Sequence, residues 1–141
     1  MARILAIDYG TKRVGIAVTD SLQIIASALD TIHAREVLNY IKLYCEKEEV
    51  STIVIGEPKK LNNESADIEQ HIKGFIKKLR KELPTVKIER EDERFTSKIA
   101  FQSMVDSGLS KKKRGQKELV DRVSATLILQ SYLEGQNQKY K

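Results

Sequence analysis

The order of apolar runs along the 141 residues predicts a single α/β domain built on a mixed sheet. Three strand-like runs come first and are followed by a helix, a strand, a helix, a strand and two helices. Strands joined by short turns pair antiparallel, whereas strands separated by a helix pair parallel. We therefore expect a mixed five-stranded sheet with three antiparallel strands, then parallel strands, flanked by helices.

In the early part of the chain, the apolar residues change from strand-like runs to a helical repeat, and this change predicts three strands followed by a helix. Residues 4–7 form a continuous apolar run, which is typical of a strand buried on both faces. Residues 14–19 return as the second arm of a hairpin, and 24–32 form the third strand. In residues 34–49 the apolar residues then recur with the period of an amphipathic helix.

The later part begins with a second continuous apolar run at 51–56, the mark of a buried parallel strand. A helix from Glu64 stops at Pro84, and residues 86–91 alternate as the last strand. A further helix is expected over 96–108, ending at the helix-stopping Gly108.

The last helix is expected over residues 116–133, before a flexible polar tail at 136–141. Its inward residues are predicted to be Leu119, Val123, Leu127 and Ile128. With no linker or repeat in the sequence, the whole range 1–141 is expected to be one domain.

Composition narrows the class of protein. The net charge of +5 and the pI of about 9.3 favour a polyanionic partner, most simply nucleic acid. The single cysteine, Cys45, excludes an internal disulfide, and no zinc-type cluster is present in the sequence. Because there is no signal-like or membrane-spanning apolar segment, we expect a cytoplasmic protein without a membrane partner.

Acidic residues follow the ends of two predicted strands and recur in the last helix. Asp8 ends the first strand, Asp92 and Glu93 end the last, and Asp121 lies beside small residues in the final helix. Carboxyl ends of strands gather at one edge of such a sheet, where sites form. Oxygen ligands without cysteine or histidine suit Mg²⁺ or Mn²⁺, which supports phosphodiester cleavage. The alternatives are a turn-forming Asp8, a solvated strand end and an exposed helix face.

A basic loop directly precedes the helix that carries Asp121. Its cations would grip phosphates and guide a nucleic-acid backbone toward the acids, or else they form a solvated loop. They are Lys111, Lys112, Lys113, Arg114 and Lys117.

Two other basic features are interpreted separately. Arg13, just after the Asp8 turn, either clamps a phosphate or pairs with an acid. The cluster in the second helix is expected to be its solvated face; it comprises Lys73, Lys77, Lys78, Arg80 and Lys81.

Four motifs in order resemble the YqgF family of Holliday junction resolvase-like proteins, also described as pre-16S rRNA nucleases. They occupy 7–20, 56–58, 92–97 and 120–125, and the resemblance spans nearly the whole chain. The resemblance implies a ribonuclease H-like fold. It also implies a divalent-metal nuclease that acts in 5′-end maturation of 16S rRNA.

Carried over by position, the family's catalytic and metal-binding acids fall on Asp8, Glu93 and Asp121. Arg13 and Arg94 fall on its motif arginines, for which substrate-binding and structural roles are both open. Because neighbours in a strand point to opposite faces, only one of Asp92 and Glu93 readily enters the site. Glu93 is preferred, with Asp92 as an orienting residue or alternate ligand.

Two further acids are weaker candidates for metal ligands. Glu57 stands where the family usually has an apolar residue, and a surface substitution is the simpler interpretation. Glu118 lies one turn before Asp121 and would serve as a helper acid.

The expected function is Mg²⁺- or Mn²⁺-dependent hydrolysis of phosphodiester bonds, with an rRNA precursor as substrate. Branched DNA and ribosomal particles are further expected partners. One rival is a non-catalytic RNA-binding ribosome-assembly factor on the same fold. The other is a junction resolvase, which requires a dimer. The sequence leaves the oligomeric state open.

Overall fold

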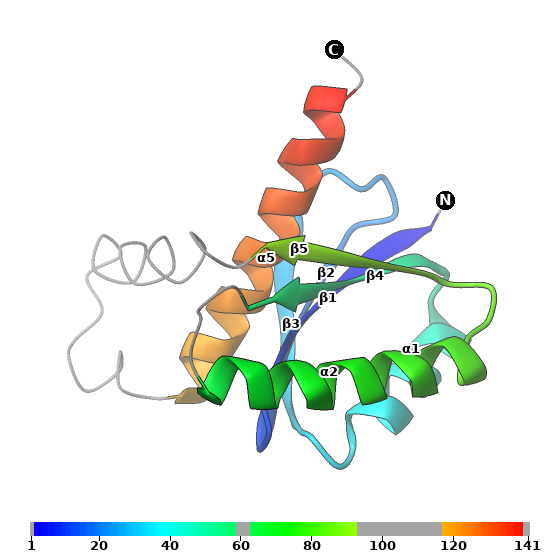
Figure 1. The fold of residues 1–141 in the computed structure, drawn as a ribbon. Helices are drawn as coiled ribbons and strands as arrows, with labels where there is room; N and C mark the ends of the chain where they lie inside the picture. Colours follow the sequence, from blue (N-terminus) through cyan, green and yellow to red (C-terminus); the bar gives the residue numbers. More distant parts are fainter. Residues whose placement is uncertain (1, 59–62, 93–116, 140–141) are drawn as a thin grey trace.

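The computed structural model describes residues 2–58, 63–92 and 117–139, and Figure 1 traces them in sequence colours. The elements in these ranges are β1 (Arg3–Tyr9), β2 (Arg13–Thr19), β3 (Ala26–His33), α1 (Val37–Lys47), β4 (Val50–Glu57), α2 (Asn63–Glu82), β5 (Lys87–Asp92) and α5 (Lys117–Lys139). None of the described helices is long and apolar enough to span a membrane.

The strands form one five-stranded sheet in the order β3-β2-β1-β4-β5. β1 pairs antiparallel with β2 and β2 with β3, whereas β4 lies parallel to both β1 and β5. The predicted mixed sheet with its antiparallel meander is therefore confirmed. β1 takes the central position, so its carboxyl end is flanked by strands on both sides.

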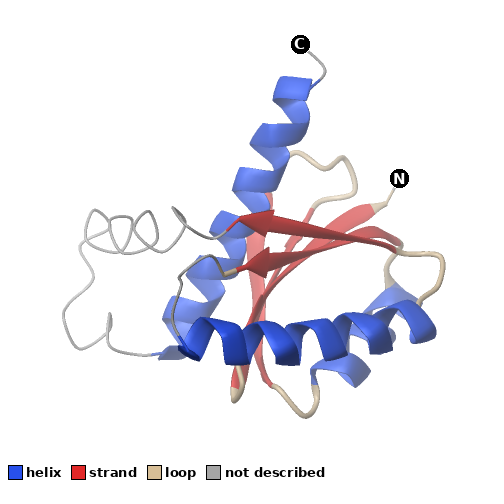
Figure 2. Cartoon of the chain, viewed as in Figure 1, coloured by secondary structure: helices blue, strands red, loops and turns tan. Residues whose placement is uncertain are grey.

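Helices cover both faces of the sheet, as Figure 2 shows. α1 and α2 pack on one face through a large aliphatic core, in which Leu5 and Ile7 of β1 are fully buried. α5 packs on the other face, mainly against β2, β3 and β1. There Ile4 and Ala6 of β1 are buried with residues of α5. The period-two alternation of β1 thus assigns its odd residues to the α1/α2 face and its even residues to the α5 face.

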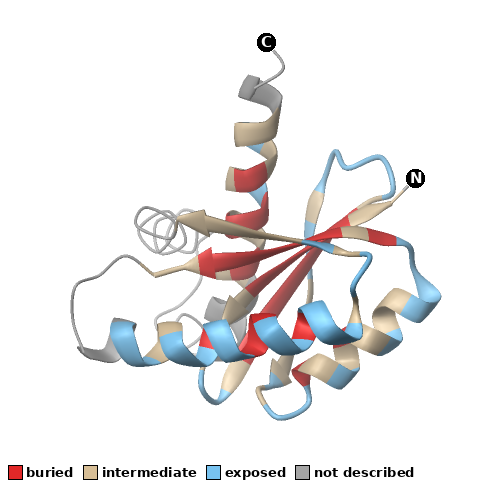
Figure 3. Cartoon of the chain, turned by 45° about the vertical axis from the view of Figure 1, so that its right-hand side comes forward, coloured by how far each residue is buried: buried red, intermediate tan, exposed pale blue. Residues whose placement is uncertain are grey.

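The α5 face is built from smaller side chains than the α1/α2 face. Ala6 and Ala17 are paired residues of β1 and β2, and both are fully buried beneath α5 together with Ala125. Small side chains on both elements allow the helix to lie close to the sheet. Figure 3 shows the resulting belt of buried residues through the central strands and the middle of α5.

The last helix differs from its predicted form in two respects. It continues to Lys139, so residues 136–139, expected in a tail, belong to α5. Val123 and Leu127, predicted to point inward, are only half-buried. Among the residues of α5 whose side chains are described, the buried ones are Ala125, Ile128, Leu129 and Tyr132, of which only Ile128 was predicted. Leu119, also predicted to point inward, lies outside them. The inward face of α5 is the one that sets Ala125 in one buried cluster with Ala6 and Ala17 of the sheet, small side chains that pack closely.

Candidate active site at the carboxyl ends of the central strands

Asp8 lies half-buried near the carboxyl end of β1, on the face covered by α5. Ile4 and Ala6, which precede it at intervals of two, pack in the core beneath α5. The same alternation gives Asp8 the same face. A carboxylate is therefore held at the point where the apolar core of the α5 face ends.

The strands on either side of Asp8 contribute glycines at this level. Asp8 is paired with Gly15 of β2. On the other side, Ile7 pairs with Ile55 of β4, so the next residue of β4, Gly56, lies beside Asp8. The residue directly beside Asp8 on each neighbouring strand is thus a glycine, which has no side chain. The backbone surface around Asp8 can therefore be approached closely by a ligand or by residues of another element.

A tight turn after Asp8 brings Arg13 back to the same edge. A Cβ added to Gly10 would lie 2.5 Å from the carbonyl oxygen of Arg13, so a larger residue would force the turn open. In β2, Arg13 has the parity of Gly15 and Ala17, and Ala17 is buried beneath α5. Arg13 therefore belongs to the same face as Asp8.

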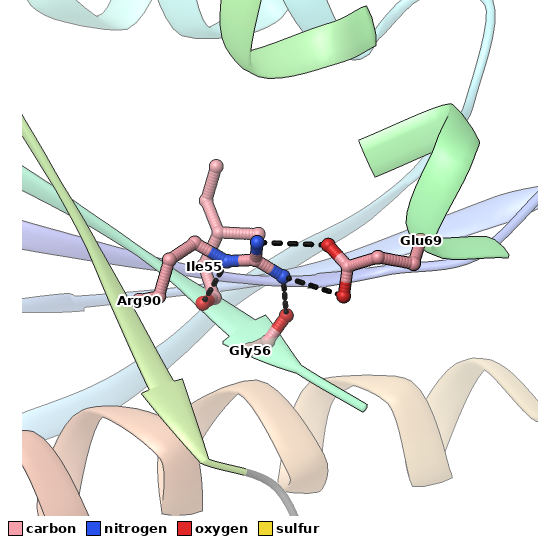
Figure 4. A network of polar contacts seen from close by, with 4 residues as sticks. All are labelled: Ile55, Gly56, Glu69 and Arg90. Carbon is pink, nitrogen blue, oxygen red and sulfur yellow. Dashed lines mark hydrogen bonds and ion pairs between the residues drawn. The ribbon is translucent and has the colours of Figure 1, made fainter. Parts of the chain in front are cut away.

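Arg90 of β5 ties the carboxyl end of β4 to α2 (Figure 4). Its Nη1 and Nη2 donate to the two carboxylate oxygens of Glu69, at 2.8 and 3.3 Å. Its Nε donates to the carbonyl of Ile55 at 3.3 Å, and Nη2 donates to that of Gly56 at 3.1 Å. This fork holds the backbone of Gly56, and with it the surface beside Asp8, in one position.

Glu91, the next residue of β5, points to the opposite layer. Ser131 of α5 donates its hydroxyl hydrogen bond to Glu91 Oε1 at 2.9 Å. Glu91 is paired with Gly56, so Asp8, Gly56 and Glu91 form a row across three adjacent strands. Two strand spacings separate Asp8 from Glu91, about 10 Å between backbones. Glu91 is an acid of this face that sequence analysis did not single out.

Asp92 and Glu57 lie on the other side of the sheet. They are paired with each other at the ends of β5 and β4. Asp92 has the parity of Arg90, which reaches α2, and Glu57 has that of Ile55, which packs in the α1/α2 core. The alternation therefore separates both carboxylates from Asp8.

Several predicted site residues lie outside the described residues. Glu93, Arg94 and the basic loop Lys111, Lys112, Lys113 and Arg114 fall in the range 93–116, as does the predicted helix over 96–108. Lys117, Glu118 and Asp121 belong to the first turns of α5, where the backbone is described and their side chains are not. Their placement in the site remains a prediction.

Within the described ranges, the candidate metal ligands make up only part of a site for a hard divalent cation. No group of three or more histidine, cysteine, aspartate or glutamate residues that could hold a metal occurs there. Asp8 supplies one carboxylate on the α5 face, and carboxylate oxygen is the donor that Mg²⁺ and Mn²⁺ prefer. The chemistry of the donor fits the expected ion, and the other predicted ligands, Glu93 and Asp121, lie outside the residues whose side chains are described.

Tyr9, although it follows Asp8 directly, belongs to the other layer. Its ring lies 5.0 Å from that of Phe75 in α2, centroid to centroid, with the planes tilted by 35°. Burial raises the pKa of the Tyr9 phenol. Tyr9 therefore remains a neutral packing residue and does not add a charge to the site.

Sequence analysis identified Asp8 and Arg13 but missed the two glycines and Glu91. Gly15 and Gly56 interrupt apolar strand runs, which is the available signal for a close approach to backbone. Glu91 has no comparable signal, because its proximity to Asp8 depends on the register between β4 and β5.

Solved structures define the class of this fold. The chain superposes on Thermus thermophilus RuvC in complex with a Holliday junction substrate with a TM-score of 0.59 at 14% identity, covering 96% of each chain. A second RuvC structure from the same organism gives a TM-score of 0.59 at 12% identity, over 95% of this chain and 96% of that one. The fold is therefore ribonuclease H-like, as the resemblance implied.

The family follows from the sequence. Residues 2–135 match the family model described as "RuvX: Holliday junction resolvase". A protein of Phocaeicola vulgatus named "Putative pre-16S rRNA nuclease" is 54% identical over 134 residues, which cover 95% of this chain and 96% of that protein. A protein of the same name from Christiangramia forsetii is 52% identical over 133 residues, covering 94% and 98%. The chain belongs to the RuvX (YqgF) family of nucleases, and the resemblance carried by its four motifs is confirmed.

Proposed function

We propose that this chain hydrolyses phosphodiester bonds of an rRNA precursor with a divalent cation, in maturation of the 5′ end of 16S rRNA. The observation that carries the proposal is Asp8, held at the end of the central strand between Gly15 and Gly56 on the α5 face. The names of the relatives supply the substrate. The cytoplasmic location expected from the sequence stays a prediction.

The proposed ligands are Asp8, Glu93 and Asp121. Support for position 93 over Asp92 comes from β5, because 93 has the parity of Glu91, whose carboxylate bonds Ser131 of α5. Support for Asp121 comes from the helical repeat. It stands four residues before Ala125 and seven before Ile128, both fully buried against the sheet.

The remaining acids have weaker support as ligands. Asp92 and Glu57 share the parity of the α1/α2 face, so a role in orienting the strand ends suits them better than coordination. Glu118 precedes Asp121 by three residues, within one turn of α5. It remains a helper acid in the proposal.

Substrate binding is assigned to basic residues around the same edge. Arg13 has the face of Asp8 and is held by the Gly10 turn. The other proposed phosphate contacts are Arg94, Lys111, Lys112, Lys113, Arg114 and Lys117. Such contacts position a backbone and carry little sequence information.

The chemistry requires a water nucleophile in line with the leaving oxygen. A bound Mg²⁺ or Mn²⁺ would supply activation of that water and stabilisation of the leaving oxygen. The residues of the chain fix the geometry: Asp8 offers a half-buried carboxylate, the Arg90–Glu69 fork immobilises the neighbouring Gly56, and Arg13 presents a cation to the phosphate.

The test is cleavage by Asp8→Asn protein. The substitution keeps the size of the side chain and removes the charge that would hold the cation. Loss of a residue that merely orients a metal ligand costs about 10- to 100-fold, so loss of the ligand itself should lower cleavage by at least that factor. The exposed Asp67→Asn in α2 is the matched control and should cut as the wild type does. Equal rates for wild type and Asp8→Asn would refute the assignment.

Junction resolution is the second candidate, favoured by the description of the matching family model. The same assay therefore compares 16S precursor RNA, single-stranded RNA and a four-way DNA junction, each with Mg²⁺ or Mn²⁺. Symmetric nicks in the junction by a dimeric protein, without cleavage of the precursor, would favour the resolvase. Binding without any cleavage would favour a non-catalytic assembly factor.

A further inference from the structure

The carboxyl-terminal half of α2 carries an exposed row of cations along a groove. Lys73, Lys77 and Arg80 are exposed and line a cavity of about 310 Å³ between α2 and β5, together with Ile76, Ile88 and Arg90. Ile76 is 7% exposed, so the floor of the groove is apolar and its rim is basic. The sequence predicted only a solvated helix face, whereas the structure shows that three of the five cations border one concave surface.

No acid of the described residues neutralises this row. Ion pairs of α2 join Glu82 to Lys42 at 3.1 Å and Glu69 to Arg90 at 2.8 Å. Both pairs use acids of α2, and Lys73, Lys77 and Arg80 form no salt bridge within the described ranges. The groove therefore presents a net positive surface, which attracts an anion.

The spacing of the cations suits a polymer of anions. At 1.5 Å of rise per residue, Lys73 and Lys77 are separated by about 6 Å along the axis, and Lys73 and Arg80 by about 10 Å. A row of separated charges can contact successive phosphates of one strand, whereas a single small anion would use only one of them.

The groove also leads toward the candidate site. Figure 1 shows α2 running antiparallel to β4 and β5, so the row from Arg80 to Lys73 approaches the carboxyl ends of these strands. Arg90 lines the groove with its side chain and binds the carbonyl of Gly56, the residue beside Asp8. A strand that follows the groove therefore reaches the carboxyl-end edge of the sheet, and Asp8 lies at the same edge on the α5 face.

We propose that the groove between α2 and β5 binds the phosphodiester backbone of a single nucleic-acid strand flanking the cleavage point, through Lys73, Lys77 and Arg80. The inference rests on the proposed nuclease function, which supplies nucleic acid as the ligand. It adds a second basic surface, on the α1/α2 side of the sheet, to the basic residues already assigned to the edge near Asp8.

The experiment measures binding of a short fluorescein-labelled single-stranded RNA by anisotropy in EDTA, over a series of salt concentrations. The test variant is Lys73→Ala/Lys77→Ala/Arg80→Ala. Each phosphate contact on a single strand contributes about 0.7 to the slope of log K against log salt, so the slope should fall by about 2. Affinity at low salt should fall at least tenfold.

The matched control removes three exposed lysines that do not line the groove, in Lys47→Ala/Lys78→Ala/Lys81→Ala. Since both variants lose the same net charge, only a local contact surface separates them. The control should keep the wild-type slope. Equal slopes for the two variants would overturn the proposal. Because all six side chains are exposed, both variants should unfold at the wild-type temperature. Measuring thermal unfolding therefore separates a loss of binding from a folding defect.

A second measurement uses the wild-type chain and needs no substitution. Amine-reactive labelling with and without the RNA should show protection of Lys73 and Lys77, and none of Lys47. Unprotected Lys73 and Lys77 on a bound complex would overturn the proposal even if the variant were to bind weakly.

The two levels of inference fail differently. A wild-type chain that cuts RNA while the groove variant keeps its slope removes the groove and leaves the nuclease function. A wild-type chain that binds no nucleic acid removes both. Because the binding assay runs in EDTA, a failure of Asp8→Asn to abolish cleavage does not affect its outcome.

Discussion

The two faces of the sheet are covered by helices but built from different side chains. The α1/α2 face buries Leu5, Ile7, Ile16, Ile53 and Ile55, each fully, beneath two helices. The α5 face buries Ala6 and Ala17 beneath one helix that contributes Ala125. A core of large aliphatic side chains buries more apolar area and so contributes more stability, whereas small side chains let a helix and a strand end approach closely. The candidate acid Asp8 belongs to the α5 face, which has the smaller side chains.

Two consecutive residues of the edge strand β5 make hydrogen bonds to the helices on opposite faces of the sheet. Arg90 reaches Glu69 of α2 with two hydrogen bonds and also holds two backbone carbonyls of β4. Glu91 accepts one hydrogen bond from Ser131 of α5. β5 thus contacts α2 and β4 through the four hydrogen bonds of Arg90 and contacts α5 through the hydrogen bond of Glu91. A site that binds a metal ion through carboxylates needs acids that are not all engaged in structural hydrogen bonds.

The largest expected effect is a cavity in the α1/α2 core. Ile55→Ala removes methylene groups from a fully buried side chain, so the free energy of unfolding should fall by about 2–5 kcal/mol. Val54→Ala, its neighbour on the α5 face, is the control and should cost less because it removes fewer atoms. Urea unfolding measures both. An equal or larger loss at Val54 would show that the α5 face contributes as much packing as the other.

The next effect tests whether the α5 face has spare room. Ala125→Leu inserts a larger side chain where the helix meets the sheet, and overpacking should lower the free energy of unfolding by about 1–3 kcal/mol. Gln130→Leu, on the exposed side of α5, is the matched control and should change stability little. If Ala125→Leu were neutral, close contact between helix and sheet would not be what selects the inward face of α5.

The smallest expected effect is the difference between the two polar contacts of β5, up to about 1.5 kcal/mol. Glu69→Gln leaves the Arg90 guanidinium, which is 24% exposed, without its carboxylate, and a hydrogen bond to a charged group contributes about 1.5–3 kcal/mol. Ser131→Ala removes one hydrogen bond to the half-buried Glu91 carboxylate and should cost about 1.5 kcal/mol, the low end of the same range. Denaturant unfolding gives both values, and amide exchange of β5 should quicken more in Glu69→Gln. A larger loss for Ser131→Ala would reverse the assignment of the stronger tie.

Much of the fold was predictable because period and turn spacing are local properties. The runs at 4–7 and 51–56 predicted two buried strands, and these are the central pair β1 and β4. Their order and direction follow from the lengths of the connections. The inward face of α5 was mispredicted from hydrophobicity, because the structure leaves Val123 and Leu127 half-buried and buries Ala125 and Leu129 fully.

The candidate site divides in the same way. Sequence by itself determined that acids follow strand ends, that Asp8 lies before a glycine turn, and that the motifs belong to one family. Only the tertiary structure decided that Gly15 and Gly56 flank Asp8, that Glu91 shares its row, and that cations of α2 border a groove with β5. These facts depend on register and on packing between residues far apart in the chain. Local sequence carries no record of which residues such contacts bring together.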